Sequence, residues 1–306
     1  RFGKDMLIAF EYREILNASD ADRCKFLERD LWIRYPKAQE ILERLEVLCA
    51  HLEMQRMPNV LIIGPSNNGK SMIKRKFCRN HEKSYEHTTY LGQQFRRMSK
   101  VEVISIQMPI SPSITRFISA LGDEIGKDFA HTTRNAQESI ICPALKERGV
   151  KMIIIDELHN ILSGTSRQQI EFLNMIRYLG NELCIPIVCL GTKDAYLALR
   201  SDPQLENRFE PHILPVWQEG DAFCKLLMSF TQILPLKDIS YLHAPEVASW
   251  ILRKSEGIIG EISKIIKMAA RQAIVQKVES IDLKILKSIG YQSPSERRAS
   301  FEQMLH

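Results

Sequence analysis

The sequence predicts an α/β fold in which a parallel β-sheet is covered by helices on both faces and is followed by a smaller helical part. Three observations predict this fold. An apolar strand at residues 59–63 runs into a glycine-framed loop and then into a helix. A second strand, at residues 150–157, has four consecutive apolar residues, which is typical of a buried parallel strand, and ends in two acids. From about residue 218, helices follow one another without strands.

The loop after the first strand has the spacing G-x-x-x-x-G-K-[ST] of a phosphate-binding P-loop. Gly64 and Gly69 let the backbone turn tightly and direct its N–H groups toward phosphate oxygens at a helix N-terminus. We expect Lys70 to neutralise the β- and γ-phosphates and Ser71 to offer its hydroxyl to Mg²⁺. The alternative is an ordinary glycine-rich turn between a strand and a helix. The expected nucleotide-binding residues are Gly64, Pro65, Ser66, Asn67, Asn68, Gly69, Lys70, Ser71 and Met72.

The two acids that end the strand at 150–157 argue against that alternative. Ligands of open α/β sheets bind at the carboxyl ends of the strands, so Asp156 and Glu157 are expected beside the P-loop. We expect Asp156 to hold Mg²⁺, directly or through water, together with Ser71. Glu157 is expected to orient and deprotonate the attacking water. If the acids do not act in this way, they merely cap the next helix. The sequence therefore predicts an ATPase that uses ATP and Mg²⁺.

The composition is that of an ordinary globular protein, with 44% apolar and 26% charged residues among 306. No run approaches the roughly 18 apolar residues that span a bilayer, and a signal peptide is not expected. The seven cysteines form no C-x-x-C pair, which favours reduced thiols in a cytoplasm. The net charge of +5 permits a nucleic-acid partner without requiring one. Four histidines show no metal-ligand spacing and are assigned to the surface or to packing, namely His81, His87, His131 and His159.

Three parts are expected along the chain. Residues 1–54 form an N-terminal helical extension and linker, residues 55–217 form the α/β nucleotide-binding domain, and residues 218–306 form a helical lid and C-terminal tail. Residues 81–100 are polar and are expected to be irregular. Ser280 is the expected N-cap of the fourth lid helix. The expected strands are 59–63, 101–106, 150–157, 185–190 and 212–216.

The order of these elements resembles the core of an AAA+ ATPase, which implies a five-stranded parallel sheet in the order 5-1-4-3-2 and a C-terminal helical lid. The segments WIRYPKAQEIL (32–42) and RMPNVLIIGPSNNGKS (56–71) are similar to the TniB/TnsC family of transposition regulators of bacterial transposons, including CRISPR-associated ones. This resemblance covers about residues 20 to 290. It implies a cytoplasmic bacterial regulator that uses ATP, assembles as a homo-oligomer or filament on duplex DNA, and connects a target-selection protein to the transposase.

The resemblance also assigns roles to residues outside the P-loop. Thr192 stands where a sensor-1 residue contacts the γ-phosphate region. Arg208 matches the arginine finger, which would reach the ATP of a neighbouring subunit. Trp32 and Tyr35 are expected to line the adenine pocket, with simple core packing as the alternative. Glu261 stands where sensor 2 often supplies an arginine, so that sensor 2 is either absent or supplied by Lys264.

DNA contacts are the least explicit expectation. In the resembled family, two helix starts face the inside of the oligomer and touch the DNA backbone, which gives sequence-tolerant binding. The alternative reading of these side chains is solvated loop charge. Two other functions are kept open: an initiator- or helicase-loader-like ATPase of replication, and a protein scaffold switched by nucleotide. The candidate DNA-binding residues are Ser113, Thr115, Arg116, Lys127, Thr133 and Arg134.

Overall fold

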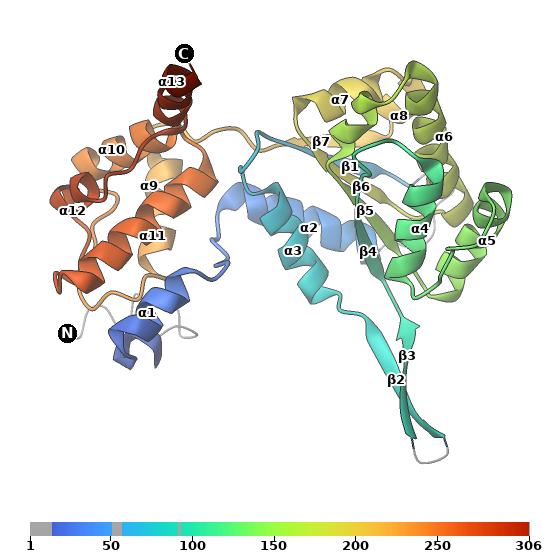
Figure 1. The fold of residues 1–306 in the computed structure, drawn as a ribbon, viewed down its shortest axis with the longest axis horizontal. Coiled ribbons are helices and arrows are strands. Elements are labelled where there is room, and N and C mark those ends of the chain that lie inside the picture. Colours follow the sequence, from blue (N-terminus) through green and yellow to red (C-terminus); the bar gives the residue numbers. More distant parts are fainter. Residues whose placement is uncertain (1–13, 51–56, 91–92, 306) are drawn as a thin grey trace. The chain divides into compact units, whose positions relative to one another are not determined.

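The computed structural model describes residues 14–50, 57–90 and 93–305, without the side chains of 86–97 (Figure 1). By its backbone contacts the chain divides into two compact units. The sheet unit comprises 40–66 and 70–214. The helical unit comprises the described residues up to Gln39, the short segment Asn67–Gly69, and the chain from Pro215 onward. The middle of the P-loop therefore belongs, by its contacts, to the helical unit.

Five parallel strands form the sheet of the sheet unit (Figure 1). They pair in the order β4-β5-β6-β1-β7. Because a separate hairpin supplies β2 and β3, these strands are the second, third, fourth, first and fifth of the sheet in chain order. Read from the other edge, the order is 5-1-4-3-2, as expected. The strands are β1 (Asn59–Ile63), β4 (Val103–Gln107), β5 (Met152–Asp156), β6 (Ile187–Gly191) and β7 (Phe209–Ile213).

The central strands are buried because helices cover both faces of the sheet. Every residue of β5 and of β6 is buried. Phe117 and Phe172 meet edge to face, with ring centroids 5.6 Å apart, and tie two of these helices together. The helices of the sheet unit are α2 (Pro36–Ala50), which begins in the helical unit, α3 (Lys70–Asn80), α4 (Ile114–Glu124), α5 (Arg134–Glu147), α6 (Ser166–Leu183), α7 (Lys193–Arg200) and α8 (Pro203–Glu206), with the 3₁₀ helix η3 (Leu158–Ser163).

The expectation of irregular structure at 81–100 is wrong. The segment forms the antiparallel hairpin of β2 (Ser84–Tyr90) and β3 (Gln93–Lys100), which projects from the sheet unit in Figure 1. The sequence SYEHTTY is rich in the strand formers Tyr and Thr but has no alternation of apolar and polar residues, so the periodicity signal is missing.

Two smaller expectations also need correction. The last strand of the sheet ends at Ile213 rather than at residue 216, and it contains Pro211. A proline is tolerated there because β7 is an edge strand that pairs with β1 alone. The fourth lid helix is capped by Asp282 rather than Ser280, since Asp282 Oδ1 accepts a hydrogen bond from Ile285 N at 2.8 Å.

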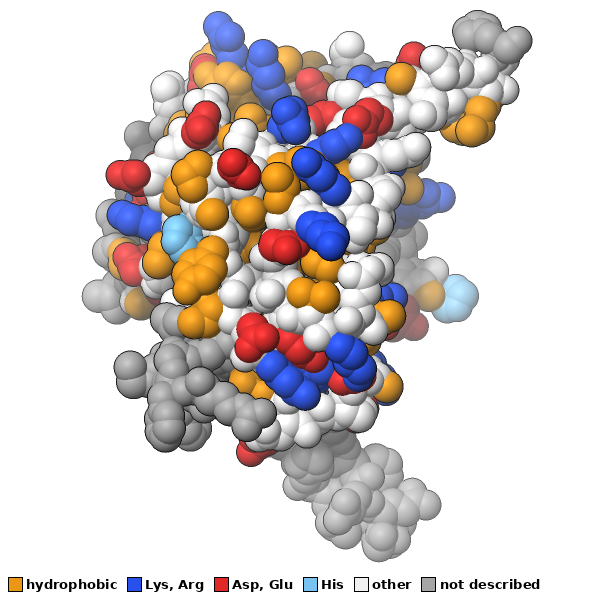
Figure 2. Space-filling model, turned by 90° about the vertical axis from the view of Figure 1, so that its left-hand side faces the viewer, with side chains coloured by type: hydrophobic (Ala, Val, Ile, Leu, Met, Phe, Trp, Pro, Cys, Tyr) orange, Lys and Arg blue, Asp and Glu red, His pale blue; other side chains and the backbone are white. Residues whose placement is uncertain are grey.

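The helical unit is built around α11 (Ile259–Val275), which contacts α1 (Asp20–Leu27), α10 (Pro245–Ser255) and α12 (Leu283–Ser288). Ile262, Ile266 and Ala270 of α11 have no exposed surface. The unit also contains the 3₁₀ helix η2 (Glu14–Asn17), α9 (Asp221–Thr231) and α13 (Pro294–Leu305). The face of the molecule in Figure 2 has positive, negative and hydrophobic side chains interspersed. No helix in the described part of the chain is long and apolar enough to cross a membrane.

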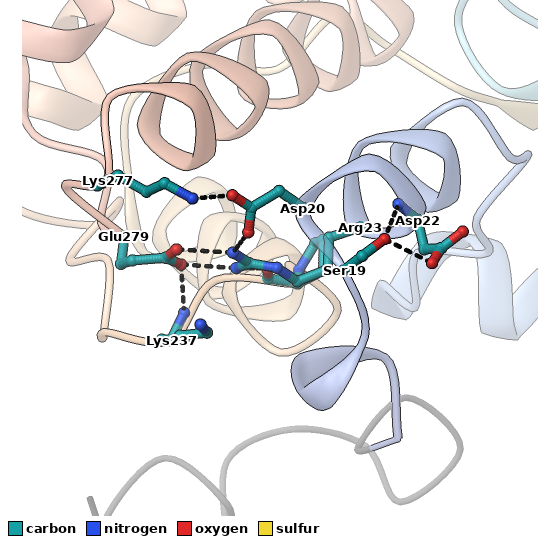
Figure 3. Close-up of polar contacts among 8 residues, drawn as sticks. Ser19, Asp20, Asp22, Arg23, Lys237, Lys277 and Glu279 are labelled. Carbon is teal, nitrogen blue, oxygen red and sulfur yellow. Dashed lines mark hydrogen bonds and ion pairs between the residues drawn. The ribbon is translucent and has the colours of Figure 1, made fainter.

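A buried arginine joins α1 to the C-terminal helices of this unit (Figure 3). Arg23 has no exposed surface, and its guanidinium donates to both carboxylate oxygens of Glu279 at 2.7 Å. It also donates to Asp20 at 2.6 Å and to the carbonyl of Pro235 at 3.0 Å. The bonds from Arg23 hold the pKa of Glu279 below its ordinary value. The N-terminal helix is therefore fixed to the lid by charge-assisted bonds as well as by apolar packing.

We expect Arg23→Ala to lower the free energy of unfolding of the helical unit by about 3–5 kcal/mol, because it leaves a largely buried carboxylate without its partner. The three tryptophans, Trp32, Trp217 and Trp250, all lie in this unit, so the fluorescence change in a denaturant titration reports its unfolding. The exposed neighbour Lys25 provides the control, and Lys25→Ala should change the value by less than about 0.5 kcal/mol. Equal losses in the two variants would contradict a structural role for the guanidinium.

Candidate active site

The P-loop leaves β1 at the carboxyl edge of the sheet. Gly64 N donates to the carbonyl of Gly191 at the end of β6, with an N–O distance of 3.2 Å. Gly69 has a φ of +88°, a backbone conformation that L side chains rarely adopt, so this position requires glycine. Asn67 is also left-handed, with a φ of +59°, which asparagine tolerates better than most residues. The loop thus turns sharply and delivers Lys70 and Ser71 as the first residues of α3.

Lys70 is a buried cation, with 6% of its surface exposed. Its Nζ donates to the carbonyls of Gly64 and Pro65, both at 2.7 Å. Burial lowers the pKa of Lys70, while nearby Glu157 and Asp156 act in the opposite direction. No carboxylate within the described residues forms an ion pair with it. Backbone carbonyls satisfy its hydrogen bonds but leave the charge uncompensated, so the position fits a phosphate group.

Ser71 and Asp156 lie together, although 85 positions separate them in the chain. Ser71 Oγ is 3.4 Å from Asp156 Oδ2, and the same oxygen forms an ion pair with Lys74 Nζ at 2.6 Å. The other carboxylate oxygen accepts the backbone N–H of Glu157 at 2.9 Å. A hydroxyl beside a carboxylate supplies the oxygen ligands that Mg²⁺ prefers, so these residues fit that ion. Sequence reasoning missed Lys74 as a partner of Asp156, because nothing in the P-loop pattern specifies the residue one helical turn later.

Glu157 follows β5 directly and begins η3. Its φ is +56°, a left-handed conformation, so the chain turns sharply here. The Glu157 side chain is about one-third exposed, at 36%. Glu157 Oε2 lies 3.1 Å from Nε2 of His159. The sequence had assigned His159 to the surface or to packing, and this contact to Glu157 was missed because the histidine matches no motif.

Thr192 and Arg208 lie at opposite edges of the sheet. Thr192 follows β6 at the carboxyl edge, directly after the residue whose carbonyl accepts from Gly64, and its hydroxyl is 3.4 Å from Asp194. The carbonyl of Arg208 accepts from the N–H of Asn59, the first residue of β1, at the amino edge. The five residues of β1 separate this edge from the P-loop, a distance of roughly 15 Å. Arg208 donates instead to Asn181 at 2.7 Å.

Within the helical unit, the middle of the P-loop caps the N-terminus of α11. Gly260 N donates to the carbonyl of Asn67 at 3.0 Å, and Ile259 N lies 3.3 Å from Asn68 Oδ1. These bonds satisfy two of the N–H groups that a helix start leaves without partners. A Cβ at Gly260 would lie 2.0 Å from Asn67 Oδ1, so a larger residue here would displace the Asn67 side chain.

Glu261 faces partners from three segments of the helical unit. Asn67 Nδ2 lies 3.3 Å from Oε1, Tyr291 donates its hydroxyl to Oε2, and Arg297 of α13 forms an ion pair with Oε2 at 3.1 Å. Burial raises the pKa of Glu261, but the bonds from Tyr291 and Arg297 outweigh it, so that the pKa lies below its ordinary value. The negative charge of Glu261 is thus compensated within the helical unit. Lys264 lies 5.9 Å from the centre of the Tyr291 ring.

Of the two aromatic residues expected near the adenine, Tyr35 lies beside the P-loop. A Cβ at Gly69 would be 3.3 Å from the Tyr35 hydroxyl, and the Tyr35 ring packs edge to face on Trp217, with centroids 5.4 Å apart. Burial raises the pKa of Tyr35 to about 12. Trp32 is partly exposed.

The candidate DNA-binding residues surround the start of α4 and the turn between α4 and α5. Ser113 caps α4, with Oγ 3.4 Å from Arg116 N, and Thr115 and Arg116 are exposed in the first turn. Arg134 is already paired, with Glu138 at 2.8 Å and Glu171 at 3.3 Å. By contrast, no ion pair of Arg116 occurs within residues 14–50, 57–90 and 93–305. The remaining two residues, Lys127 and Thr133, are exposed.

Comparisons with known proteins agree with this geometry. The family model described as "Bacterial TniB protein" matches residues 23–219. The fold is similar to that of the Aeropyrum pernix ORC1 protein, solved in complex with DNA, at 18% identity and a TM-score of 0.56 over 91% of this chain and 69% of that one. It is also similar to the Walker-type ATPase PABY2304 of Pyrococcus abyssi, at 13% identity and a TM-score of 0.55 over 91% and 75% of the two chains. No curated protein matches the sequence.

We expect Lys70→Ala to weaken binding of a non-hydrolysable ATP analogue by at least about 30-fold, because the phosphate loses its buried cation. Isothermal titration calorimetry measures this directly. Arg79→Ala removes an exposed cation from the last turn of the same helix and should leave the affinity unchanged. An affinity close to that of the wild type would refute the assignment of the P-loop.

We expect Glu157→Gln to keep ATP binding but to slow hydrolysis by roughly 10²-fold or more, because an amide cannot accept the proton of the attacking water. Steady-state phosphate release together with calorimetry separates the two effects. If the variant turned over ATP at the wild-type rate, another residue would have to be the base.

Proposed function

The chain belongs to the TniB family and has the fold of an AAA+ ATPase, and from this premise we propose that it is an ATP-dependent regulator of transposition that assembles on duplex DNA. One observation carries the proposal furthest. The loop that leads from β4 into the candidate DNA-binding helix α4 is hydrogen-bonded to the segment that follows Asp156. The nucleotide site and the exposed start of α4 are therefore parts of one bonded structure in the sheet unit.

Four hydrogen bonds form this connection. Met108 N donates to the carbonyl of Asp156 at 2.8 Å, and Asn160 Nδ2 donates to the carbonyl of Met108 at 3.1 Å. Ser163 Oγ donates to the carbonyl of Ile110 at 2.6 Å. The fourth bond, from Gln168 Nε2 to the carbonyl of Pro112, is 3.4 Å long. A change in the backbone at Asp156 is thus passed to the residues that precede α4.

The proposed reaction is hydrolysis of ATP to ADP and phosphate. Lys70 neutralises the β- and γ-phosphates, and the N–H groups of the P-loop bind their oxygens. Mg²⁺, when bound by Ser71 and Asp156, supplies compensation for the charge that develops on the phosphate oxygens. Glu157 accepts a proton from the water that attacks the γ-phosphorus, and the bond from that phosphorus to the bridging oxygen of ADP breaks. Thr192 holds the γ-phosphate region from the end of β6.

Arg208 is proposed to act on the nucleotide of a neighbouring subunit. Its position at the amino edge of the sheet removes it from the P-loop of its own chain. A cation that reaches the transition state of the next subunit makes turnover depend on assembly, as in arginine-finger ATPases. The homo-oligomer is thus part of the proposal.

The proposed DNA contacts are to the phosphate backbone. Thr115 and Arg116 lie in the first turn of α4, where the helix N-terminus also favours an anion. Such contacts position a protein on a duplex without reading its sequence. The ORC1 protein, which has a similar fold, was solved in complex with DNA, and this is compatible with DNA as the proposed partner.

A transposase and a target-selection protein complete the proposed set of partners. Electron microscopy of the protein with ATP and duplex DNA separates this function from its alternatives. A continuous helical filament is the expected result. Closed rings would favour a role in replication, and assembly with ATP but without DNA would favour a protein scaffold.

We expect ATP-dependent duplex binding with little sequence preference and with a steep loss of affinity as salt rises. Arg116→Ala should lower the affinity for all sequences alike and reduce the slope of log K against log salt by about one unit. Arg134→Ala is the matched variant, and its effect should be smaller because Glu138 and Glu171 already compensate that charge. Fluorescence anisotropy with two unrelated duplexes over a salt series measures both.

Two results would count against the proposal, at different levels. Wild-type protein that binds no duplex with ATP would remove DNA from the function. An Arg116→Ala variant that binds like the wild type throughout the salt series would leave DNA binding intact but place it on another surface.

A further inference from the structure

His159 forms a contact with the expected catalytic base that no sequence motif assigns. Its Nε2 lies 3.1 Å from Glu157 Oε2. The side chain is mostly buried, with 26% exposed, and Nδ1 is buried without a hydrogen-bond partner among the described residues. A histidine that only filled space in the core would not need a ring nitrogen this close to the carboxylate of Glu157.

The carboxylate of Glu157 can only accept, so Nε2, the ring nitrogen beside it, carries a hydrogen. An N–H on Nδ1 would be buried without an acceptor among the described residues, which would cost free energy. The approach of Nε2 to Oε2 at 3.1 Å is a close polar contact rather than an aligned hydrogen bond.

The surroundings of the ring fix its position. His159 lies on η3, which packs against both β6 and α7. A Cβ at Gly191 would lie 3.5 Å from Nδ1 and 3.7 Å from His159 N, so the ring lies against the residue that precedes Thr192. The imidazole thus stands between the carboxylate of Glu157 and the strand end that carries the expected γ-phosphate contact.

We propose that His159 is a positioning residue that fixes the carboxylate of Glu157 for its role as general base. This inference rests on the proposed function of Glu157. The left-handed backbone of Glu157 fixes where the side chain starts, but its torsions leave the carboxylate free to turn. The close contact from His159 restrains Oε2 and leaves Oε1 available to the attacking water. Because Gly191 touches the same ring, the orientation of the base is also sensitive to the position of the β6 end.

The test compares two substitutions at this position. His159→Phe keeps an aromatic ring but has no donor, and it should lower kcat by roughly 10- to 100-fold, the usual loss when a catalytic group is misplaced by about an ångström. KM for ATP and the affinity for a non-hydrolysable analogue should stay unchanged. His159→Gln can place an amide N–H near Oε2 and should recover most of the lost kcat. His243→Phe changes an exposed histidine of the helical unit and serves as the control.

The double variant His159→Phe with Glu157→Gln shows whether the histidine acts through the glutamate. We expect it to be no slower than Glu157→Gln alone. A wild-type kcat for His159→Phe, or equal losses of kcat for the Phe and Gln variants with normal thermal stability, would overturn the positioning role while leaving the base intact. A wild-type rate for Glu157→Gln would instead remove the base itself, and the inference with it.

Discussion

The proposed chemistry of the sheet unit depends on a buried ammonium group with which no carboxylate of the described residues forms an ion pair. Two carbonyls of the P-loop hold Lys70 Nζ, and burial lowers its pKa, so the charged form is disfavoured until an anion such as phosphate binds beside it. The parallel sheet supplies the rest. Because β1, β5 and β6 run in the same direction, their carboxyl ends meet at one edge, and Asp156 reaches Ser71 and Lys74 there. The direction of the strands therefore determines the site. If β5 ran in the opposite direction, Asp156 and Glu157 would lie at the other edge of the sheet, away from the P-loop.

The sequence alone predicted the parts whose signal is local. The apolar runs of β1 and β5 and the glycine spacing of the P-loop report burial and backbone shape directly, and the observed strands lie within a few residues of the expected ones. The strand order came from the family resemblance, because periodicity does not say which strands are neighbours. The predicted boundaries of two elements were wrong where a local rule has an exception. The strand β7 contains Pro211 because it is an edge strand, and α12 is capped by Asp282 in place of Ser280.

Contacts between distant positions could not be predicted. Arg23 and Glu279 are 256 positions apart, and neither has a neighbour in the sequence that announces the pair. Glu261 stands where the resembled family often has an arginine, and the sequence does not reveal that Tyr291 and Arg297 meet its carboxylate. The sequences of β2 and β3 have no alternation of apolar and polar residues that would indicate strands. In each case the missing information is the identity of the partner.

Asp156 connects the proposed nucleotide site to the loop that leads into the candidate DNA-binding helix α4. Its side chain contacts Ser71 and Lys74, while its carbonyl accepts from Met108 at the start of the loop into α4. If Mg²⁺ took the place of the Lys74 ammonium beside Asp156, a shift of the carboxylate would strain the bonds that Asp156 makes, because hydrogen bonds weaken steeply when their geometry is distorted. The loop before α4 and Glu157, which is the next residue, would oppose or follow such a shift. In the proposed function, Asp156 would thus couple the nucleotide to the candidate DNA-binding helix, and reciprocal coupling requires that bound DNA act back on the base.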